Sequence, residues 1–318
     1  MAGSSIGQAP RVIVTGICSR IGRLVARELH REMEVIGIDQ RPFDGLPRDI
    51  ISHRIDIRRR RSRDIFRRSR ADAVVHLGLS YDPRRSGRGA HSWNIEVFSS
   101  ILTFISDFRI SRLVLLSNAS VYGPHPDNPQ FIPEDYPLYG ADTFAQIRDI
   151  VEIDMLAQSS FWRNPDCSLV ILRPVNIVGG VRNPLMGYLR LNHPPTVLGF
   201  DPMLQLTHER DVARAVRLSL KPEAKGIFNI AGTGQMPLSM LLRKTGRRGV
   251  PMPSPLLRRV SSLASRAMRM DFLPREVDYL MYTCMVDTER AEKVLGFEPR
   301  YDMAGCINAI LEDRLWKS

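Results

Sequence analysis

A glycine-containing turn, Thr15–Gly22 (TGICSRIG), separates a short apolar run from an amphipathic one. Gly16 permits a tight turn, and Gly22 permits close packing of the next helix on a sheet. The N-terminus of such a helix offers free N–H groups to a pyrophosphate. Ser19 replaces the middle glycine of this pattern, so its side chain narrows the approach of a phosphate. The turn predicts dinucleotide binding through Gly16, Ile17, Ser19, Arg20, Ile21 and Gly22.

Asp39 ends the apolar run VIGID, about twenty residues beyond the turn. A carboxylate at this place can accept both ribose hydroxyls of NAD, and it repels the 2′-phosphate of NADP. Arg41 is the opposing observation, because a guanidinium can accept that phosphate. We expect NAD rather than NADP, with Asp39, Gln40 and Arg41 around the ribose. The alternative is that Asp39 is a turn residue after a strand.

Short apolar runs alternate with amphipathic runs through the first half of the chain, and these runs predict the elements that hold the turn. The predicted strands are Arg11–Gly16, Val35–Asp39, His53–Ile57, Ala73–Leu77, Leu113–Ser117 and Leu169–Leu172. The predicted helices run from about Ile21 to Arg31, Ser92 to Phe108 and Gly140 to Gln158. Continuous apolar strands separated by helices indicate a parallel sheet covered on both faces. The fold class is therefore α/β, with a Rossmann-type doubly wound sheet.

The pattern changes after Arg173. Residues 179–202 are rich in Pro, Gly and Asn, which favours loop with short helical pieces. Further on we expect a helix at Asp211–Leu220, a strand at Gly226–Ile230, a proline-rich joint at Pro251–Pro255 and an amphipathic helix at Leu256–Met270. These elements predict a Rossmann domain of residues 1–178, completed by 204–232. Residues 179–203 and 233–318 would form a smaller, mixed substrate-binding lobe.

The chain of 318 residues has a net charge of +11, and most of its cations are arginines. This excess could attract nucleic acid, anionic lipid or an anionic metabolite. No nucleic-acid motif accompanies it, so a solvated arginine-rich surface is preferred and no nucleic-acid partner is expected. For the helix Leu256–Met270, simple packing ranks ahead of contact with a diphosphate, an acyl-CoA or a membrane surface.

Targeting and metal signals are weak throughout the sequence. No apolar run is long enough for a transmembrane helix, and residues 1–10 lack the apolar region of a secretory signal. The four scattered cysteines fit a reducing compartment, so we expect the cytoplasm. The histidines lack paired ligand spacing, so no metal site is expected.

The order of motifs resembles the extended short-chain dehydrogenases/reductases, and more narrowly the NAD-dependent epimerase/dehydratase family. The motifs are TGICSRIG, VIGID, VVHLG, LLSNASVYG, LRPVNIVGG, HERDVARAV, FNIAG and RAEKVLGFEPRY. The resemblance implies a set of further cofactor contacts, namely Asp56 and Ile57 at the adenine, Leu77 and Gly78 through their backbone, Asn94, Ser117, and Pro174 near the nicotinamide. It also implies substrate contacts by Arg182 and by Asn176, which would meet a substrate diphosphate. The alternative for Asn176 is a loop-stabilising amide.

The resemblance also implies a catalytic group. In this family a tyrosine takes a proton from a substrate hydroxyl during hydride transfer, a lysine four residues later lowers its pKa, and a Ser or Thr polarises the substrate oxygen. The corresponding residues here are Tyr139, Thr143 and Asn118. An unassisted tyrosine is ionised in only about one molecule in a thousand at pH 7, and Thr143 carries no charge. Asn118 can still donate a hydrogen bond to a substrate oxygen.

Three functions follow, and the sequence leaves them open. The first is an NAD-dependent epimerase/dehydratase-like oxidoreductase for a hydroxyl or carbonyl of an anionic substrate, with a sugar nucleotide first. The second is a catalytically degenerate NAD(H)-binding sensor or assembly protein. The third is a dehydrogenase or reductase of lipid or sterol-like alcohols, which a hydrophobic cavity would favour. The resemblance also implies a homodimer through the helices predicted at Ser92–Phe108 and Gly140–Gln158.

Overall fold

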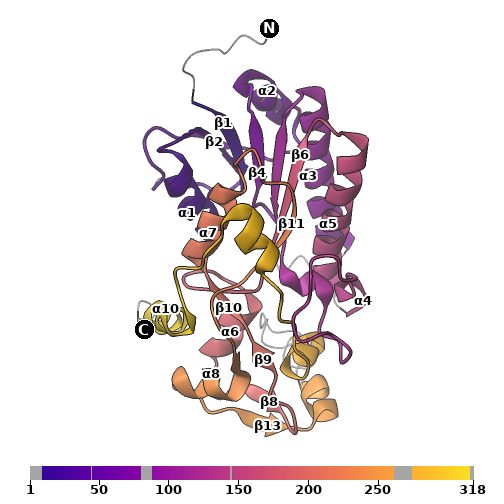
Figure 1. Cartoon of the computed structure of the whole chain (residues 1–318), viewed down its shortest axis with the longest axis vertical. Helices are drawn as coiled ribbons and strands as arrows, with labels where there is room; N and C mark the ends of the chain where they lie inside the picture. The colour runs from indigo at the N-terminus through magenta and orange to yellow at the C-terminus, as the bar shows by residue number, and fades with distance from the viewer. Residues whose placement is uncertain (1–8, 44, 80–87, 144, 261–273, 316–318) are drawn as a thin grey trace.

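A seven-stranded parallel sheet forms the centre of the molecule (Figure 1). The computed structural model describes residues 9–43, 45–79, 88–143, 145–260 and 274–315. The strands of the sheet are β1 (Arg11–Thr15), β2 (Glu34–Asp39), β3 (Ile51–Arg54), β4 (Ala73–His76), β5 (Arg112–Leu116), β6 (Ser168–Pro174) and β11 (Gly226–Ile230). Their order is β11-β6-β5-β4-β1-β2-β3. The order reverses between β1 and β4, and ligands of such sheets bind at the carboxyl ends of the strands near this point.

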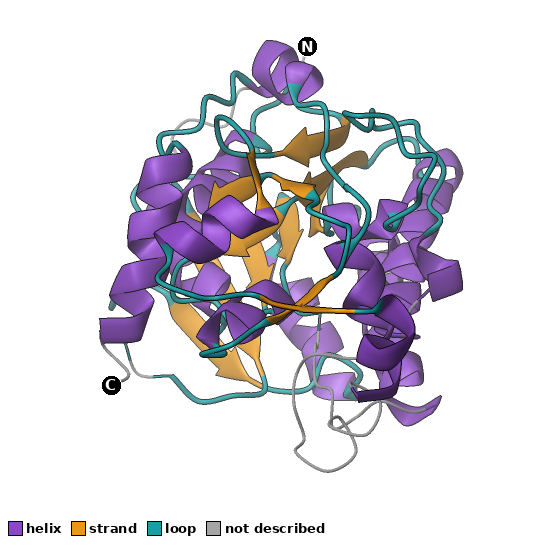
Figure 2. Cartoon of the chain, turned by 90° about the horizontal axis from the view of Figure 1, so that it is seen from below, coloured by secondary structure: helices purple, strands orange, loops and turns teal. Residues whose placement is uncertain are grey.

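Helices cover both faces of the sheet, as Figure 2 shows from below. Successive side chains of a strand point to opposite faces. Val12 and Val14 accordingly pack in one core with α1 (Arg20–Leu29) and α7 (Glu209–Leu218). Ile13 packs in a second core with α2 (Arg60–Ser69), α3 (Arg88–Asp107) and α5 (Ala145–Arg163). This arrangement confirms the predicted Rossmann-type α/β fold.

Three two-stranded sheets lie below the central sheet in Figure 1. They pair β7 (Asn176–Val178) with β10 (Leu206–His208), β9 (Met203–Leu204) with β12 (Met236–Pro237), and β8 (Pro195–Val197) with β13 (Val250–Met252). The shorter helical elements are η2 (Ala119–Tyr122), α4 (Gly140–Thr143), α6 (Pro184–Arg190), α8 (Leu238–Lys244), η3 (Pro274–Leu280), η4 (Ala291–Leu295) and the longer α10 (Met303–Leu315). The division into a Rossmann domain and a lobe remains a prediction.

Two predicted segments differ from the observed elements. The third strand was expected at His53–Ile57 but ends at Arg54, because Asp56 leaves the sheet to accept hydrogen bonds from the Arg58 backbone and to bond Ser62 through its carbonyl. The joint predicted at Pro251–Pro255 begins as strand β13, because a two-stranded ribbon has free edges where proline is tolerated. Of the helix predicted at Leu256–Met270, residues 256–260 are helical, within a helical run that begins at residue 254, and 261–270 lie outside the described residues.

The predicted helix at Gly140–Gln158 corresponds to α4 and to α5, which continues to Arg163. Within the part of the chain that the structure describes, no helix is both long and apolar enough to cross a membrane.

Candidate cofactor and substrate site

The turn after β1 brings two backbone segments into close contact. Gly16 has φ +75°, and a Cβ there would lie 2.8 Å from the Cα of Gly78. A Cβ on Gly22 would lie 2.4 Å from the carbonyl oxygen of Gly16. Neither position can hold a side chain without moving backbone, so both glycines are required by the geometry of the turn. This is the tight turn and close helix packing that a pyrophosphate cradle needs.

Ser19 has a structural role that its position alone did not indicate. Its hydroxyl oxygen accepts a hydrogen bond from the Gly22 N–H at 2.9 Å and caps α1. The N–H groups of Arg20 and Ile21 belong to the first turn of the helix, where no carbonyl four residues earlier is available. These two donors remain for an anion at the helix N-terminus.

Arg20 ties this turn to a distant segment. Its Nε lies 2.9 and 3.0 Å from the two carboxylate oxygens of Glu209, at the start of α7. The Glu209 side chain is buried, and a Cβ on Gly179 would lie 2.7 Å from its carboxyl carbon. Sequence reasoning did not single out Glu209, although the motif HERDVARAV contains it. The ion pair fixes the cofactor turn against the chain that follows β7.

Asp39 lies at the carboxyl end of β2, where a ribose acid is expected. Its Oδ1 accepts hydrogen bonds from the Arg41 N–H and Nε, each at 3.0 Å. Its Oδ2 accepts from Arg41 Nη2 at 2.9 Å and from the Cys18 N–H at 3.0 Å. Burial alone would raise the pKa of Asp39, but the bonds from Arg41 outweigh it and hold the pKa below its usual value.

These four bonds occupy the four acceptor positions of the carboxylate. Ribose hydroxyls can reach Asp39 only when the Arg41 side chain swings away, and that side chain is 60% exposed. Arg41 therefore covers the ribose acid. Gln40 beside it is exposed.

His76 lies at the end of β4, beside the cofactor turn. Its Nδ1 is 2.6 Å from the hydroxyl oxygen of Thr15, whereas its buried Nε2 has no hydrogen-bond partner among the residues described. Burial lowers the pKa of His76 to about 4, so the ring is neutral at pH 7.

The other predicted cofactor residues lie at the same edge of the sheet but have partners of their own. Asp56 pairs with Arg58 at 2.8 Å, and this bond holds the pKa of Asp56 below its usual value. Asn94 donates to Asp149 at 3.0 Å, and Ser117 donates to Asp154 at 2.8 Å. Ile17, Ile21 and Ile57 are buried, Leu77 and Ser117 border a cavity, and Pro174 ends β6.

A cavity of about 290 Å³ lies where the carboxyl ends of β4, β5 and β6 meet the chain below the sheet. The sheet contributes Leu77, Leu116, Ser117, Asn118 and Val175, and the lower part contributes Met203, Leu204, Leu238, Tyr279, Leu280 and Tyr282. Most of the lining is apolar, and Arg182 is the one charged side chain among the described residues that line it.

Both predicted substrate residues line this cavity. Asn176 Nδ2 donates to the Gln205 carbonyl at 3.2 Å, so part of its amide stabilises the loop. No carboxylate among the described residues pairs with Arg182. Arg182 thus offers an uncompensated positive charge at the cavity.

The predicted catalytic residues do not all meet at the cavity. Asn118 lines it, but its Oδ1 accepts from the Ser120 N–H at 2.8 Å, which leaves its Nδ2 as the donor. Tyr139 is 42% exposed, stacks on His125 at 5.6 Å between ring centroids, and is not among the cavity-lining residues. The side chain of Thr143 lies outside the part that the structure describes.

The cations Arg173, His208 and Arg148 do not take the place of the missing lysine. Arg173 is buried and bonds Asp154 at 2.7 Å and the hydroxyl of Tyr122 at 2.9 Å. Burial raises the pKa of Tyr122 to about 12 despite that guanidinium. His208 caps α7 and stacks on Tyr301 at 3.6 Å, and Arg148 is exposed. Arg173 therefore serves a structural network rather than Tyr139.

Tyr279 and Tyr282 were missed by sequence reasoning. They come from a segment without a recognisable motif, and only the folded chain brings them to the cavity.

Comparison with known proteins agrees with this geometry. The model of the NAD dependent epimerase/dehydratase family matches residues 12–231. An uncharacterized protein of Mycobacterium tuberculosis is 30% identical over 307 residues, covering 92% of this chain and 81% of that protein.

Two solved structures share the fold. A dTDP-glucose 4,6-dehydratase from Bacillus anthracis in complex with NAD has a TM-score of 0.73 at 14% identity, with 98% of each chain covered. A UDP-glucose 4-epimerase from Thermotoga maritima with UDP-glucose has a TM-score of 0.73 at 18% identity, covering 96% of this chain and 99% of that one. The chain therefore belongs to the NAD-dependent epimerase/dehydratase family, and its cofactor is NAD, as the glycine turn and Asp39 predicted.

Proposed function

We propose that this chain is an NAD-dependent oxidoreductase that acts on a hydroxyl or carbonyl of an anionic substrate, with a sugar nucleotide as the first candidate. The observation that carries the proposal is the cavity beside the carboxyl ends of the central strands, which contains Asn118, Asn176 and Arg182. Bound NAD supplies the hydride acceptor of such a reaction. Two fold relatives are a dehydratase of dTDP-glucose and an epimerase of UDP-glucose, which supports this substrate class.

The side chains around the cavity have separable roles in this proposal. Arg182 binds the anionic group, and the apolar walls exclude water, which strengthens every polar contact inside. Asn118 donates from Nδ2 to the oxygen that reacts, as an oxyanion donor does. Tyr139 is the group that accepts the substrate proton, and it has to turn from His125 toward the cavity to do so.

The first experiment is a titration of the purified chain with NADH and, separately, NADPH, followed by nicotinamide fluorescence. Micromolar binding of NADH with weak binding of NADPH is expected. A hydride-transfer screen with UDP-glucose and dTDP-glucose follows. Tyr139→Phe should abolish any turnover, and Thr143→Lys should raise it because a nearby ammonium lowers the pKa of the tyrosine.

Tyr136→Phe is the matched control, because Tyr136 packs edge-on against Tyr139 at 5.9 Å. Turnover that survives Tyr139→Phe would remove the tyrosine from the mechanism. NADH binding without turnover of any substrate would refute the proposal that the chain is an enzyme.

A second candidate is a non-catalytic NAD(H)-binding sensor or assembly protein. The position of Tyr139 outside the cavity lining favours it, together with the absence of a lysine at position 143. Tight NADH binding without exchange of the nicotinamide hydride, and a stable protein partner in pull-downs, would distinguish this candidate from the enzyme.

The third candidate, an enzyme for lipid or sterol-like alcohols, gains support from the apolar lining of the cavity. The hydride-transfer screen therefore includes a long-chain alcohol and a sterol. Turnover of these without turnover of nucleotide sugars would establish it over the first candidate.

We also propose that the chain forms a homodimer through α3 and α5. Met155 and Trp162 of α5 are 56% and 82% exposed, which is unusual for large apolar side chains and suits a contact between copies. Light scattering measures the mass, and Trp162→Ser should shift it toward a monomer.

A further inference from the structure

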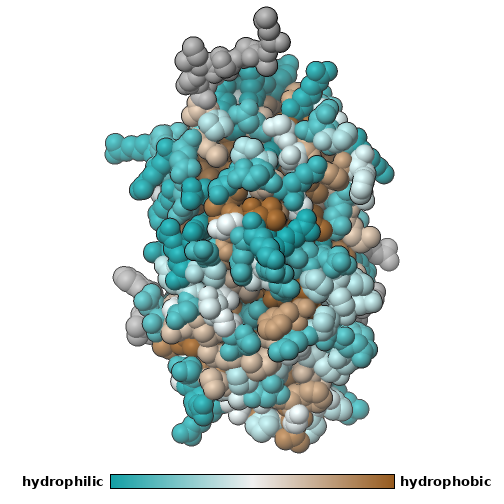
Figure 3. Space-filling model, viewed as in Figure 1, coloured by the Kyte–Doolittle hydropathy of each residue, from teal (hydrophilic) through white to brown (hydrophobic). Residues whose placement is uncertain are grey.

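The lower end of the molecule carries exposed apolar side chains. It consists of the ribbon of β8 and β13, residues 198–201 after β8 and the helical residues 254–260, which we call the β8–β13 tip. Five large apolar side chains are exposed here, namely Leu198 (62%), Leu256 (48%), Phe200 (43%), Val260 (43%) and Val250 (42%). Figure 3 shows brown side chains among teal ones at this end. Single exposed apolar residues are ordinary, but a group of them at one end of a molecule indicates an interaction surface.

These residues are held together by backbone contacts. Val250, Pro251 and Met252 pair in register with Pro195, Thr196 and Val197, and the Leu198 N–H donates to the Met252 carbonyl at 2.9 Å. Leu257 is buried and its N–H donates to the Pro253 carbonyl, which anchors the helix on the ribbon. The exposed side chains are therefore presented by a rigid support.

The charge of the tip and of the chain leading into it is mainly positive. Residues 240–260, from α8 to the end of the tip, contain six lysines and arginines and no aspartate or glutamate. Arg243, Lys244, Arg248 and Arg259 are exposed, and none of them forms an ion pair with a residue that the structure describes. Two acids lie at this end: Asp201 of the tip accepts hydrogen bonds from Ser239, and Asp278 pairs with Arg258.

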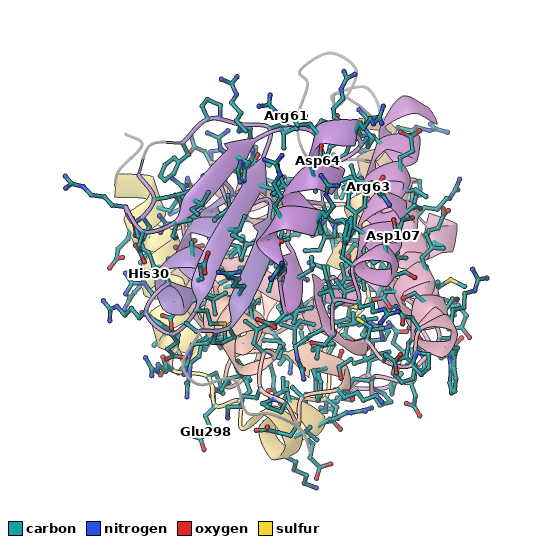
Figure 4. All side chains as sticks on the ribbon, turned by 90° about the horizontal axis from the view of Figure 1, so that it is seen from above. His30, Arg61, Arg63, Asp64, Asp107 and Glu298 are labelled. Atoms are coloured by element: carbon teal, nitrogen blue, oxygen red, sulfur yellow. The ribbon has the colours of Figure 1, made fainter. Side chains whose placement is uncertain are left out.

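The arginines of α2 at the other end of the molecule provide a contrast. There Arg63 pairs with Asp107 and Arg67 pairs with Asp64, each at 2.9 Å (Figure 4). Two of the five arginines of α2 are thus paired with acids, and the large apolar side chains of α2, Ile65 and Phe66, are not exposed. The cations at the tip differ because they stand beside exposed apolar side chains.

We propose that the β8–β13 tip binds the surface of an anionic lipid bilayer. Leucine, phenylalanine and valine side chains enter the boundary between headgroups and acyl chains, and the arginines bind lipid phosphates. A nucleic acid would satisfy the arginines but would leave the aliphatic side chains in water, so the bilayer fits both halves of the surface. Phe200 packs edge-on against Tyr282, which lines the cavity, so the tip adjoins the substrate site.

The test is co-sedimentation of the full chain with vesicles, without NAD or substrate, so that its outcome does not depend on the proposed function. One set of vesicles is phosphatidylcholine, and the other is an equal mixture of phosphatidylcholine and phosphatidylglycerol. Binding to the mixed vesicles alone is expected, and added salt should weaken it because screening shortens the reach of the arginines.

Two double variants locate the surface. Arg248→Glu with Arg259→Glu should lower partitioning by about tenfold or more, because each cation near an anionic surface contributes appreciably to binding. Leu198→Ser with Leu256→Ser should lower it by about tenfold. Arg60→Glu with Arg61→Glu on α2 makes the same change in net charge and should bind as the unaltered chain does. Circular dichroism melting verifies that each variant is folded.

Several results would overturn the proposal. The first is failure of the unaltered chain to sediment with mixed vesicles, a result that needs no variant. Equal losses in the tip and α2 variants would mean that only net charge matters. Displacement from vesicles by an RNA oligonucleotide, with the leucine variant unaffected, would assign the tip to nucleic acid. A dimer in light scattering that Leu198→Ser with Leu256→Ser dissociates would assign it to a second copy of the chain.

Discussion

The cofactor side and the reaction side of this molecule are built differently. The cofactor side consists of backbone contacts, in which Gly16 and Gly22 bring the turn, α1 and Gly78 together, plus one acid at the end of β2. The proposed reaction side is the cavity, where the chemistry would depend on individual side chains, and two of the three residues that the family resemblance implies are replaced, by Asn118 and Thr143. A cradle made of backbone groups can keep its shape with a serine at position 19 in place of glycine. A tyrosine whose lysine partner is replaced loses the positive charge that would lower its pKa.

A second difference lies in how charges are paired. Arg173 and Asp154 form a buried pair beneath the reaction side, with side chains 1% and 0% exposed. The pair of Arg41 with Asp39 is half open, because Arg41 is 60% exposed. A buried pair that loses one partner leaves an uncompensated charge, whereas an exposed guanidinium can leave its partner for solvent. The reaction side is therefore rigid beneath its surface, and the ribose acid can be uncovered.

The largest expected effect comes from the buried pair. Asp154→Ala should lower the free energy of unfolding by about 3–5 kcal/mol, because Arg173 is left buried and uncompensated. Urea denaturation measures this loss. Arg67→Ala is the control, since its exposed pair with Asp64 contributes at most about 1 kcal/mol. Equal small losses in both variants would contradict the rigidity ascribed to this region.

Adding a side chain to a glycine of the cofactor turn should weaken NADH binding. Gly22→Ala places a Cβ 2.4 Å from the carbonyl oxygen of Gly16 and forces backbone to move. A displaced turn moves the N–H groups that face the pyrophosphate, and lost hydrogen bonds to a charged group cost about 1.5–3 kcal/mol, so the Kd for NADH should rise by roughly 10- to 100-fold. Gly199→Ala strains a loop after β8, where φ is +84°, but its Cβ meets nothing within 4 Å, so it should leave the NADH titration unchanged. Undiminished binding by Gly22→Ala would show that the backbone cradle is not what binds the cofactor.

Substitutions of Asp39 and Arg41 should change NADH affinity in opposite directions. Asp39→Ala removes charged hydrogen bonds that contribute about 1.5–3 kcal/mol, so NADH affinity should fall by roughly 10- to 100-fold. Arg41→Ala frees the acceptor positions of the carboxylate and should raise NADH affinity by about threefold, a small gain for an exposed pair. Nicotinamide fluorescence measures both. A fall in NADH affinity for Arg41→Ala would mean that the guanidinium binds the cofactor instead of covering its acid.

His76 should make stability depend on pH. Its pKa is about 4 in the folded chain against 6.5 when unfolded, so between these values only the unfolded chain binds the proton. Protonation of the unfolded chain therefore lowers the free energy of unfolding as pH falls from 6.5 toward 4, and it has no effect well above pH 6.5. The loss between pH 7 and pH 5 is about 2 kcal/mol.

The measurement is urea denaturation at these two pH values for the unaltered chain and for His76→Gln. The variant should lose about 2 kcal/mol less than the unaltered chain, whereas His193→Gln, at an exposed position, should not differ from it. Identical pH dependence in His76→Gln would show that the buried ring is not the titrating group.

The tertiary structure decided which distant residues meet. Arg20 pairs with Glu209 across 189 positions, Arg173 bonds Tyr122 and not Tyr139, and Tyr279 and Tyr282 reach the cavity from a segment without a motif. Covering of Asp39 by Arg41 also depends on a rotamer that no spacing predicts. The same helices and strands could pack in many ways, each of which would bring different side chains together, so the sequence does not specify these contacts.

The sequence by itself determined the parallel sheet, the glycine turn, the NAD cofactor and the family. Strand periodicity and the absence of a Cβ act within a few residues, so they can be read along the chain. The position of Tyr139 on the surface and the partners of the buried charges depend on how separate segments pack. Local geometry therefore predicted the glycine turn and the cofactor, and only the folded chain decided which side chains line the cavity.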